Sequence, residues 1–320
     1  MRPKSINSLM ACMRGKGIKI VGSTQKKKLR YMGYFHGYKG YRYCHSNRFL
    51  FSDFNELQSI YDFDMRIKTL LYPSIMFIET ALKNYALECI FSTNNSGTFA
   101  DIFVHCLTYY KSFNVGSSDY KEAMKKRLEL RNHIYSTISR EYKRNIISHY
   151  YDKDEAVPIW AIFELITLGE FGAFVSCMDI GLKKDFSKEI GIKSSFDADG
   201  KIPEMYIYAI KDLRNAIAHN GVVFDTRFKT ANINSRIASY LQSETHIRNI
   251  SFDTILDYFV LIVVIMKGLN INKTSLYALV NDFEREYESL RSKIPVSLYN
   301  QIAYTNTRGN LTLLKNYIKS

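Results

Sequence analysis

The sequence has few residues that interrupt helices and few that cross-link small folds. Its 320 residues include only five prolines, 16 glycines and five cysteines. Low proline and glycine content disfavours a turn-rich β architecture, and long segments repeat apolar residues every three or four positions. Because 46% of the residues are hydrophobic, the chain can also bury a substantial core. The sequence therefore predicts an all-α fold.

The five cysteines are widely separated and form no C-x-x-C pair, which argues against a disulfide framework or a zinc site. The most apolar stretch, FVLIVVIM at 259–266, is too short to cross a bilayer. We therefore expect it to be a buried core helix. Common phosphate-loop, dinucleotide, metalloprotease and serine-hydrolase motifs are also missing. These absences predict a cytoplasmic protein that needs no membrane, metal or cofactor.

Acidic residues are missing from the start of the chain. Twelve of the 44 basic residues lie in the first 50 positions, and the first acidic residue is Asp53. The remaining 32 basic residues nearly balance the 31 acidic ones, so this segment carries nearly all of the formal net charge of +13. A solvated basic face is one explanation. Such one-sided charge favours an anionic partner, and we predict that this partner is RNA.

Aromatic and basic residues alternate within LRYMGYFHGYKGYRYCHSNRFLF, residues 29–51. Flat rings stack on bases and cations bind phosphates, so residues 1–52 are predicted to be an RNA-binding segment that precedes a helical domain at 53–320. The predicted RNA-binding residues are Lys26, Lys27, Lys28, Arg30, Tyr34, Tyr38, Lys39, Tyr41 and Arg42. The alternative is that most of these tyrosine rings pack the segment onto the helical domain.

Apolar periodicity predicts most of the helices. Residues 54–91 are expected to form one or two helices interrupted near Pro73, and a further helix begins at Pro158. Other helices are expected near residues 120–150, from Glu204 to a left-handed stop at Asn220-Gly221, and near 253–268, 274–292 and 295–318.

The segment KDLRNAIAHNGVVFD, residues 211–225, places polar side chains at a helix end. Arg214 and His219 lie about 140° apart around an ideal helix, so they do not share a face. Asn215 and His219 are four residues apart, which predicts that Asn215 orients the imidazole. Considered alone, such a segment is more often structural.

These residue types suit cleavage of RNA. Histidine can accept the proton of a ribose 2′-hydroxyl or protonate the departing 5′-oxygen, and a guanidinium can hold the charged phosphate oxygens. The products would be a 2′,3′-cyclic phosphate and a 5′-hydroxyl. The reaction requires no metal ion.

Four segments occur in an order that is typical of one family: SLMACMRGKGI with the tyrosine block, DMRIKTLLYPSIMFIETALKN, ISHYYDKDEAVPIWAIFELITLGEF and LRNAIAHNGVVFDTRF. The chain thereby resembles the HEPN superfamily and, more narrowly, the Abi-like family of bacterial abortive-infection proteins, near the AbiF and AbiD types. The resemblance implies a HEPN-like helical bundle and a ribonuclease toxin of phage defence.

The same resemblance implies roles for individual residues. Arg214 and His219 take the catalytic positions, Asn215 a polar supporting one, and Glu79 and Asn220 further supporting ones. Trp160 and Glu164 match the third segment, where core packing and a buried polar contact are expected.

KRNIISHYY repeats the R-N-x-x-x-H spacing at Arg144, Asn145 and His149, which leaves open a second half-site in the same chain. We consider a structural helix end or a basic surface the simpler interpretation. A single functional copy predicts a homodimer, because Arg214 and His219 do not converge within one helix. Two alternatives remain: a non-catalytic protein that holds a small non-coding RNA, and a helical scaffold for other proteins.

Overall fold

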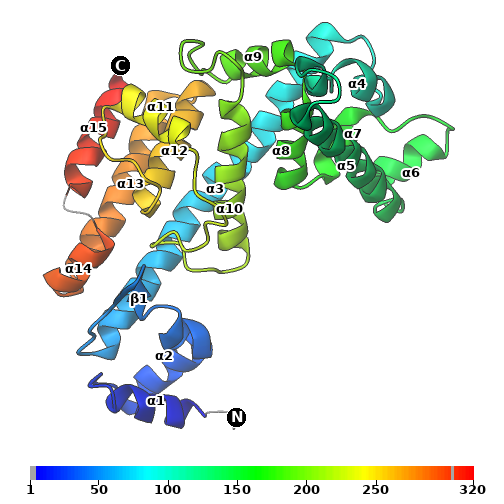
Figure 1. Ribbon diagram of the computed structural model, residues 1–320. Helices are drawn as coiled ribbons and strands as arrows, with labels where there is room; N and C mark the ends of the chain where they lie inside the picture. Colours follow the sequence, from blue (N-terminus) through cyan, green and yellow to red (C-terminus); the bar gives the residue numbers. More distant parts are fainter. Residues whose placement is uncertain (1–4, 304–305) are drawn as a thin grey trace.

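One long helix organises the molecule. The computed structural model describes residues 5–303 and 306–320, and its helix α3, Phe54–Thr93, spans 40 residues. Asp53 and Glu56 start α3 with a reciprocal capping box. The helix runs from the N-terminal elements at one end to α4 and α9 at the other (Figure 1). Apolar residues at helical spacing, including Ile67, Leu71, Ile75 and Ile78, are buried along it.

Pro73 lies inside α3 without interrupting it, so the predicted break is wrong. A proline lacks the N–H that would donate to the carbonyl four residues earlier, here that of Thr69. Both Pro73 and Thr69 are exposed, so water can solvate the free carbonyl. Buried neighbours such as Leu71 and Ile75 anchor the opposite face, and the helix therefore continues.

The C-terminal helices cover one flank of α3 (Figure 1). They are α11 Ser235–Thr245, α12 Ile255–Gly268, α13 Lys273–Arg291, α14 Val296–Ile302 and α15 Thr307–Lys319. Residues 255–265 of α12 are all buried, which confirms the predicted core helix. The helix predicted for 295–318 is instead α14 and α15, and residues 304–305 lie outside the described residues. Sequence periodicity missed α11.

A second group of helices surrounds the other end of α3 (Figure 1). It comprises α4 Phe99–His105, the short 3-10 helix η2 Tyr109–Ser112, α5 Ser118–Arg140, α6 Asn145–Tyr151, α7 Ile159–Leu165, α8 Leu168–Cys177 and α9 Ile180–Glu189. The predicted 120–150 helix is wrong in one respect, because it is broken after Arg140. Glu141 leaves helical geometry, and Arg144 is extended. The helix predicted from Pro158 likewise ends at Leu165, and Thr167 and Glu170 cap a new one.

Helix α10, Ile202–Ala218, links the two groups by packing against α8 and also contacting α3, α9, α11 and α12. The buried carboxylate of Asp197 accepts hydrogen bonds from the backbone N–H groups of Lys201 and Ile202, which fixes the start of α10. The predicted start near Glu204 and the predicted stop at Asn220-Gly221 are therefore confirmed to within two residues.

The N-terminal segment packs on the first turns of α3. It contains α1 Ile6–Arg14, α2 Gly22–Tyr34, the π-helical turn η1 Phe35–Lys39 and a hairpin of two short strands, β1 Tyr43–Cys44 and β2 Asn47–Arg48. This hairpin is the only sheet in the described residues, so the all-α prediction is confirmed. Arg227 donates to the carbonyls of Gly40 at 2.8 Å and Tyr43 at 2.7 Å, and it pairs with buried Asp225. The segment is thereby fastened to the chain that follows α10.

Candidate functional site at the end of helix α10

The Arg-Asn-His motif occupies the last turn of α10 and its cap. His219 is the C-cap residue, and its backbone N–H donates to Asn215 O at 3.0 Å. Asn220 adopts a left-handed φ of 53°, which allows Gly221 N to reach Ala216 O at 2.6 Å and Asn220 N to reach Ile217 O at 3.1 Å. This is a Schellman ending, and it leaves the His219 side chain exposed at the helix end.

Arg214 is held from two directions while a third of its side chain stays exposed. Its Nε lies 3.6 Å from Glu79 Oε2, and its Nη1 donates to Asn215 Oδ1 at 3.3 Å. The two atoms of the ion pair are buried but too far apart for a good hydrogen bond. Charge attraction therefore orients the guanidinium without saturating its donors.

Asn215 differs from its predicted role. Its side chain contacts the guanidinium of Arg214, whereas the sequence predicted that it orients the His219 imidazole. Among the hydrogen bonds of the described residues, the one between Asn215 and His219 is made by the Asn215 backbone carbonyl. Within the described residues, no hydrogen bond or ion pair joins the side chains of Arg214 and His219.

Glu79 connects three elements beneath the motif. It is buried in the middle of α3, and its Oε1 lies 3.3 Å from Lys83 Nζ. Lys83 also donates to the Ile166 carbonyl at 3.1 Å, at the end of α7. The chain Arg214–Glu79–Lys83 therefore links α10 to α3 and to the α7–α8 junction.

Asn220 contacts a buried charge pair on α3 that the sequence analysis missed. Its Oδ1 accepts from Lys68 Nζ at 3.0 Å, and Lys68 pairs with Asp64 at 2.7 Å. Asp64 Oδ1 also accepts from the backbone N–H groups of Val223 and Phe224, both at 2.9 Å. A charged pair four residues apart on the buried face of α3 was the available signal. The pair fixes the path of the chain leaving the motif.

The predicted RNA-binding residues divide into a surface set and a buried set. Lys27, Lys28, Arg30, Tyr34 and Lys39 are exposed, whereas Lys26 and Arg42 are half-buried.

Tyr38 and Tyr41 are buried, which corrects their assignment to RNA binding. The Tyr41 hydroxyl donates to Asp64 at 2.8 Å, and its ring stacks on Phe224 with 6.1 Å between centroids. Burial and the negative charge of Asp64 raise the pKa of Tyr41 far above its ordinary value. These rings hold the segment to the core, as the packing alternative predicted.

Two exposed rings of the same segment were not among the predicted residues. Tyr31 is 80% exposed on α2 and Phe35 is 54% exposed at the start of η1. We call Lys27, Lys28, Arg30, Tyr31 and Phe35 the N-terminal basic surface. It offers cations and flat rings to solvent, the combination that binds single-stranded nucleic acid.

Comparison with known proteins identifies the family. Residues 27–225, more than half of the chain, match the family model described as Abi-like protein. This protein belongs to the Abi-like family. The match runs from the N-terminal basic surface to Asp225, and membership points to abortive infection as the biological context. No curated protein and no solved structure matches the chain.

The second R-N-x-x-x-H copy of this Abi-like chain lies in a different setting. Arg144 precedes the seven-residue helix α6 and pairs with Glu141 at 2.6 Å, and both Arg144 and His149 are exposed. Helix α6 lies at the edge of the molecule, far from α10 (Figure 1). The fold therefore does not bring the two copies together within one chain.

Trp160 and Glu164 also depart from the expectation. Trp160 is 45% exposed and Glu164 is exposed, so neither fills the core. The Trp160 ring packs edge-on against Tyr150 with 6.2 Å between centroids. Both side chains thus lie on the exposed face of α7, and Trp160 lies beside α6.

The described residues show no arrangement of three or more His, Cys, Asp or Glu side chains that would hold a metal ion. All five cysteines are free. No helix in the described ranges has the length and hydropathy needed to span a membrane.

Proposed function

We propose that this Abi-like protein is a metal-independent endoribonuclease that cleaves single-stranded RNA in the cytoplasm during abortive infection. One observation carries the proposal: Arg214 and His219 both remain accessible at the same end of α10, and Arg214 is oriented by a buried carboxylate. Such preorganised charge is typical of sites that stabilise a transition state.

The proposed reaction uses the nucleophile that RNA itself supplies. His219 accepts the proton of the ribose 2′-hydroxyl, the 2′-oxygen attacks phosphorus, and the bond from phosphorus to the 5′-oxygen breaks. The 5′-oxygen takes up a proton, from the imidazolium or from water. Arg214 neutralises the growing charge on the non-bridging oxygens. The products are a 2′,3′-cyclic phosphate and a 5′-hydroxyl.

Glu79 acts in this proposal as a positioning residue. It holds the Nε edge of the guanidinium, and Asn215 accepts one hydrogen bond from Nη1, which leaves Nη2 and the second hydrogen of Nη1 for a phosphate. Lys83 shares the charge of Glu79 and is anchored by the Ile166 carbonyl, so the carboxylate has little freedom to move. Precise orientation of this kind can contribute a large part of a rate enhancement.

A homodimer would complete the site. Within one chain the side chains of Arg214 and His219 make no direct contact in the described residues, although both lie near the end of α10. A two-fold axis beside this end would place a second Arg214 and a second His219 across a shared cleft. Each phosphate would then meet groups from both copies.

Cleavage assays with matched variants test the proposal. The purified protein should cut single-stranded RNA in the presence of EDTA, and His219→Ala should slow cutting by about 10²–10⁴-fold. His149→Ala removes the corresponding histidine of the α6 copy and should leave the rate unchanged. Equal loss in both variants, or full activity of His219→Ala, would remove His219 from the chemistry.

A second candidate function is RNA binding without catalysis, for example retention of a small non-coding RNA. The N-terminal basic surface favours it, because Lys27, Lys28 and Arg30 are exposed and form no ion pair in the described part of the chain. Glutamine at Lys26, Lys27, Lys28 and Arg30 should reduce the slope of log affinity against log salt by about 3.

Glutamine at Lys143 and Lys153, two exposed lysines beside α6, provides the control and should leave the slope nearly unchanged. RNA binding with this salt dependence, together with no cleavage by the wild-type protein, would favour the second function. An unchanged slope after the N-terminal substitutions would exclude that surface as the RNA contact.

A further inference from the structure

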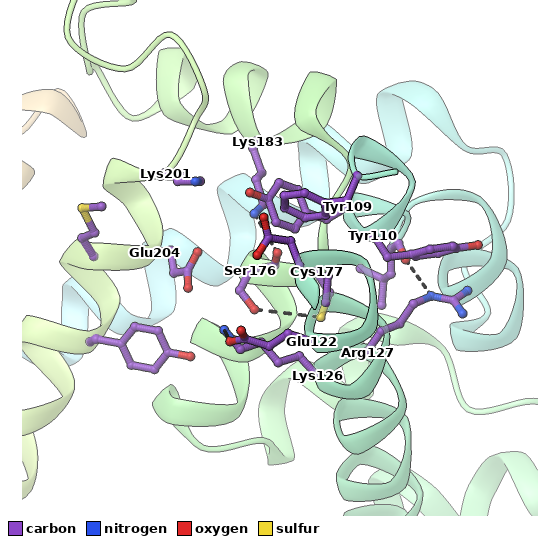
Figure 2. A pocket seen from close by; sticks show the side chains of 16 residues that line it. Tyr109, Tyr110, Glu122, Lys126, Arg127, Ser176, Cys177, Lys183, Lys201 and Glu204 are labelled. Atoms are coloured by element: carbon purple, nitrogen blue, oxygen red, sulfur yellow. Dashed lines mark hydrogen bonds and ion pairs between the residues drawn. The ribbon is translucent and has the colours of Figure 1, made fainter. Parts of the chain in front are cut away.

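A cavity of about 300 Å³ lies at the opposite end of α10 from Arg214. It is enclosed by η2, α5, the end of α8, α9 and the first turns of α10 (Figure 2). Glu204 lines it, ten residues before Arg214, which corresponds to about 15 Å along the helix axis. The cavity is therefore separate from the proposed cleavage site.

Lys183 is a fully buried lysine in the wall of this cavity. Its Nζ donates to the Ser176 carbonyl at 2.7 Å and lies 3.7 Å from the centroid of the Tyr109 ring. Within the described residues no carboxylate lies within ion-pair distance of Lys183, whereas the buried Lys68 pairs with Asp64. Burial lowers the pKa of Lys183 to about 8. A buried lysine without an ion pair is rare in proteins, so this one suggests a function.

Glu204 brings a carboxylate to the same cavity from the first turn of α10 (Figure 2). Burial raises its pKa, and Lys183 is the charge that most strongly opposes this rise. The cavity thus presents an ammonium donor and a carboxyl group to the same ligand. A purely apolar ligand would leave both charges unsatisfied, and a simple anion would be repelled by Glu204.

Aromatic rings and further charged side chains, including Asp119 and Glu122, also line the cavity. Tyr109 and Tyr208 form walls, and a Cβ at Gly172 would come within 3.0 Å of the Tyr208 ring, so the glycine accommodates the tyrosine. Lys126 and Lys201 also line the cavity, and their side chains are 59% and 40% exposed. Lys126 pairs with Glu122 at 3.1 Å and Lys201 with Asp199 at 3.6 Å, so a phosphate would replace these solvent-exposed carboxylates. Flat walls, an inner donor and acceptor, and outer cations together fit a planar polar ring that carries a phosphate.

We propose that this cavity binds a nucleotide, with the base between Tyr109 and Tyr208 and the phosphate on Lys126 and Lys201. Each of the four RNA bases presents a hydrogen-bond acceptor beside a donor on its Watson–Crick edge, which matches the donor Lys183 and the acceptor Glu204. A cavity of this size is near the lower limit for small-ligand sites, so it suits one nucleotide. The nucleotide is either a free molecule or one unit of an RNA chain. The proposal does not depend on ribonuclease activity.

Calorimetric titration of the full chain tests the cavity directly. The probes are the four ribonucleoside 5′-monophosphates, a single-stranded RNA hexamer and inorganic phosphate. At least one monophosphate or the hexamer should bind, and Lys183→Met and Glu204→Gln should each weaken that binding at least tenfold. Lys125→Met changes an exposed lysine of α5 outside the cavity and should have no effect.

The two sources of the nucleotide give different results. Binding of a monophosphate that Lys183→Met abolishes identifies a free nucleotide, whereas hexamer binding alone, weakened by the same change, identifies an RNA unit. Failure of all probes, equal binding of inorganic phosphate, or affinity unaffected by Lys183→Met would overturn the proposal. If Lys183→Met fails to fold, the double variant Lys126→Met/Lys201→Met at the exposed edge must still weaken binding for the proposal to survive.

Discussion

The two R-N-x-x-x-H copies share a sequence pattern but occupy different environments. Arg214 lies in the last turn of a 17-residue helix and is paired with a buried carboxylate from α3. Arg144 precedes a seven-residue helix and is paired with Glu141, three residues earlier on the surface. The comparison shows that the carboxylate contributed by a distant element, and not the six-residue pattern, distinguishes a candidate site from a surface helix end.

The largest difference should appear in the rate of RNA cleavage when alanine replaces either arginine. Arg214→Ala should reduce RNA cleavage by about 10²–10³-fold, since it removes a preorganised cation from the phosphate. Arg144→Ala should leave the rate within twofold. The rates are measured with the same labelled single-stranded RNA under single-turnover conditions. A strong loss in Arg144→Ala would instead indicate that the α6 copy belongs to the site.

The next largest difference is expected between Glu79 and Glu141, the glutamates that pair with the two arginines. Glu79→Gln leaves Lys83 and Arg214 without their shared counter-charge, so unfolding free energy should fall by about 1–3 kcal/mol. Cleavage should also fall by about tenfold, because the guanidinium loses its orientation. Urea denaturation and cleavage assays give the two values. Glu141→Gln is the control: its activity should match that of the wild type, and its unfolding free energy should fall much less than that of Glu79→Gln.

A smaller difference, in unfolding free energy, is expected between Asn220 and Asp154, the left-handed residues that follow α10 and α6. Asn220 and Asp154 both have positive φ, 53° and 56°, so alanine at either position costs about 1 kcal/mol of backbone strain. Asn220→Ala also removes the acceptor for buried Lys68 and should cost about 1 kcal/mol more. Denaturant unfolding measures both variants. If Asn220→Ala and Asp154→Ala lose the same unfolding free energy, the hydrogen bond from Lys68 contributes nothing to stability.

The smallest effect concerns the titration of Glu141. The hydrogen bond from Arg140 and the charge of Arg144 hold the pKa of this carboxyl below its ordinary value. The stabilisation is present above the unfolded-state pKa and is lost as pH falls through the lowered folded-state pKa. Because both arginines are exposed and the carboxylate itself is partly exposed, 1 M salt should return its pKa toward the ordinary value. Carboxyl NMR titration in low and high salt measures this, and an unchanged pKa would contradict a surface interaction.

The sequence was sufficient for the periodic parts of the fold. The apolar face of α3, the buried run in α12 and the Asn220-Gly221 stop follow from spacing and from local backbone preference. Breaks were harder to predict. The exposed Pro73 is tolerated within α3, whereas the polar stretch after Arg140 ends α5 without any proline or glycine.

The candidate site was predictable only in part. The motif itself names Arg214 and His219, but the ion pair with Glu79 depends on how α10 lies across α3. The assignment of Tyr41 to the surface was wrong because Asp64 and Phe224 reach it only in the folded chain, and Tyr38 of the same segment is also buried there. A local pattern does not reveal which ring of a tyrosine-rich block is covered by a segment nearly 200 residues away.

The hydrogen bonds from Arg227 to the carbonyls of Gly40 and Tyr43 affect how truncation experiments can be interpreted. Truncating the chain before Asp53 would remove the N-terminal basic surface and would also release the tether that steadies the residues just beyond His219. If the truncated protein lost both RNA affinity and RNA cleavage, the result would therefore not show which part of the chain is responsible for either one. Point substitutions on the outer face of α2 leave this tether in place, and they are the appropriate way to separate the two.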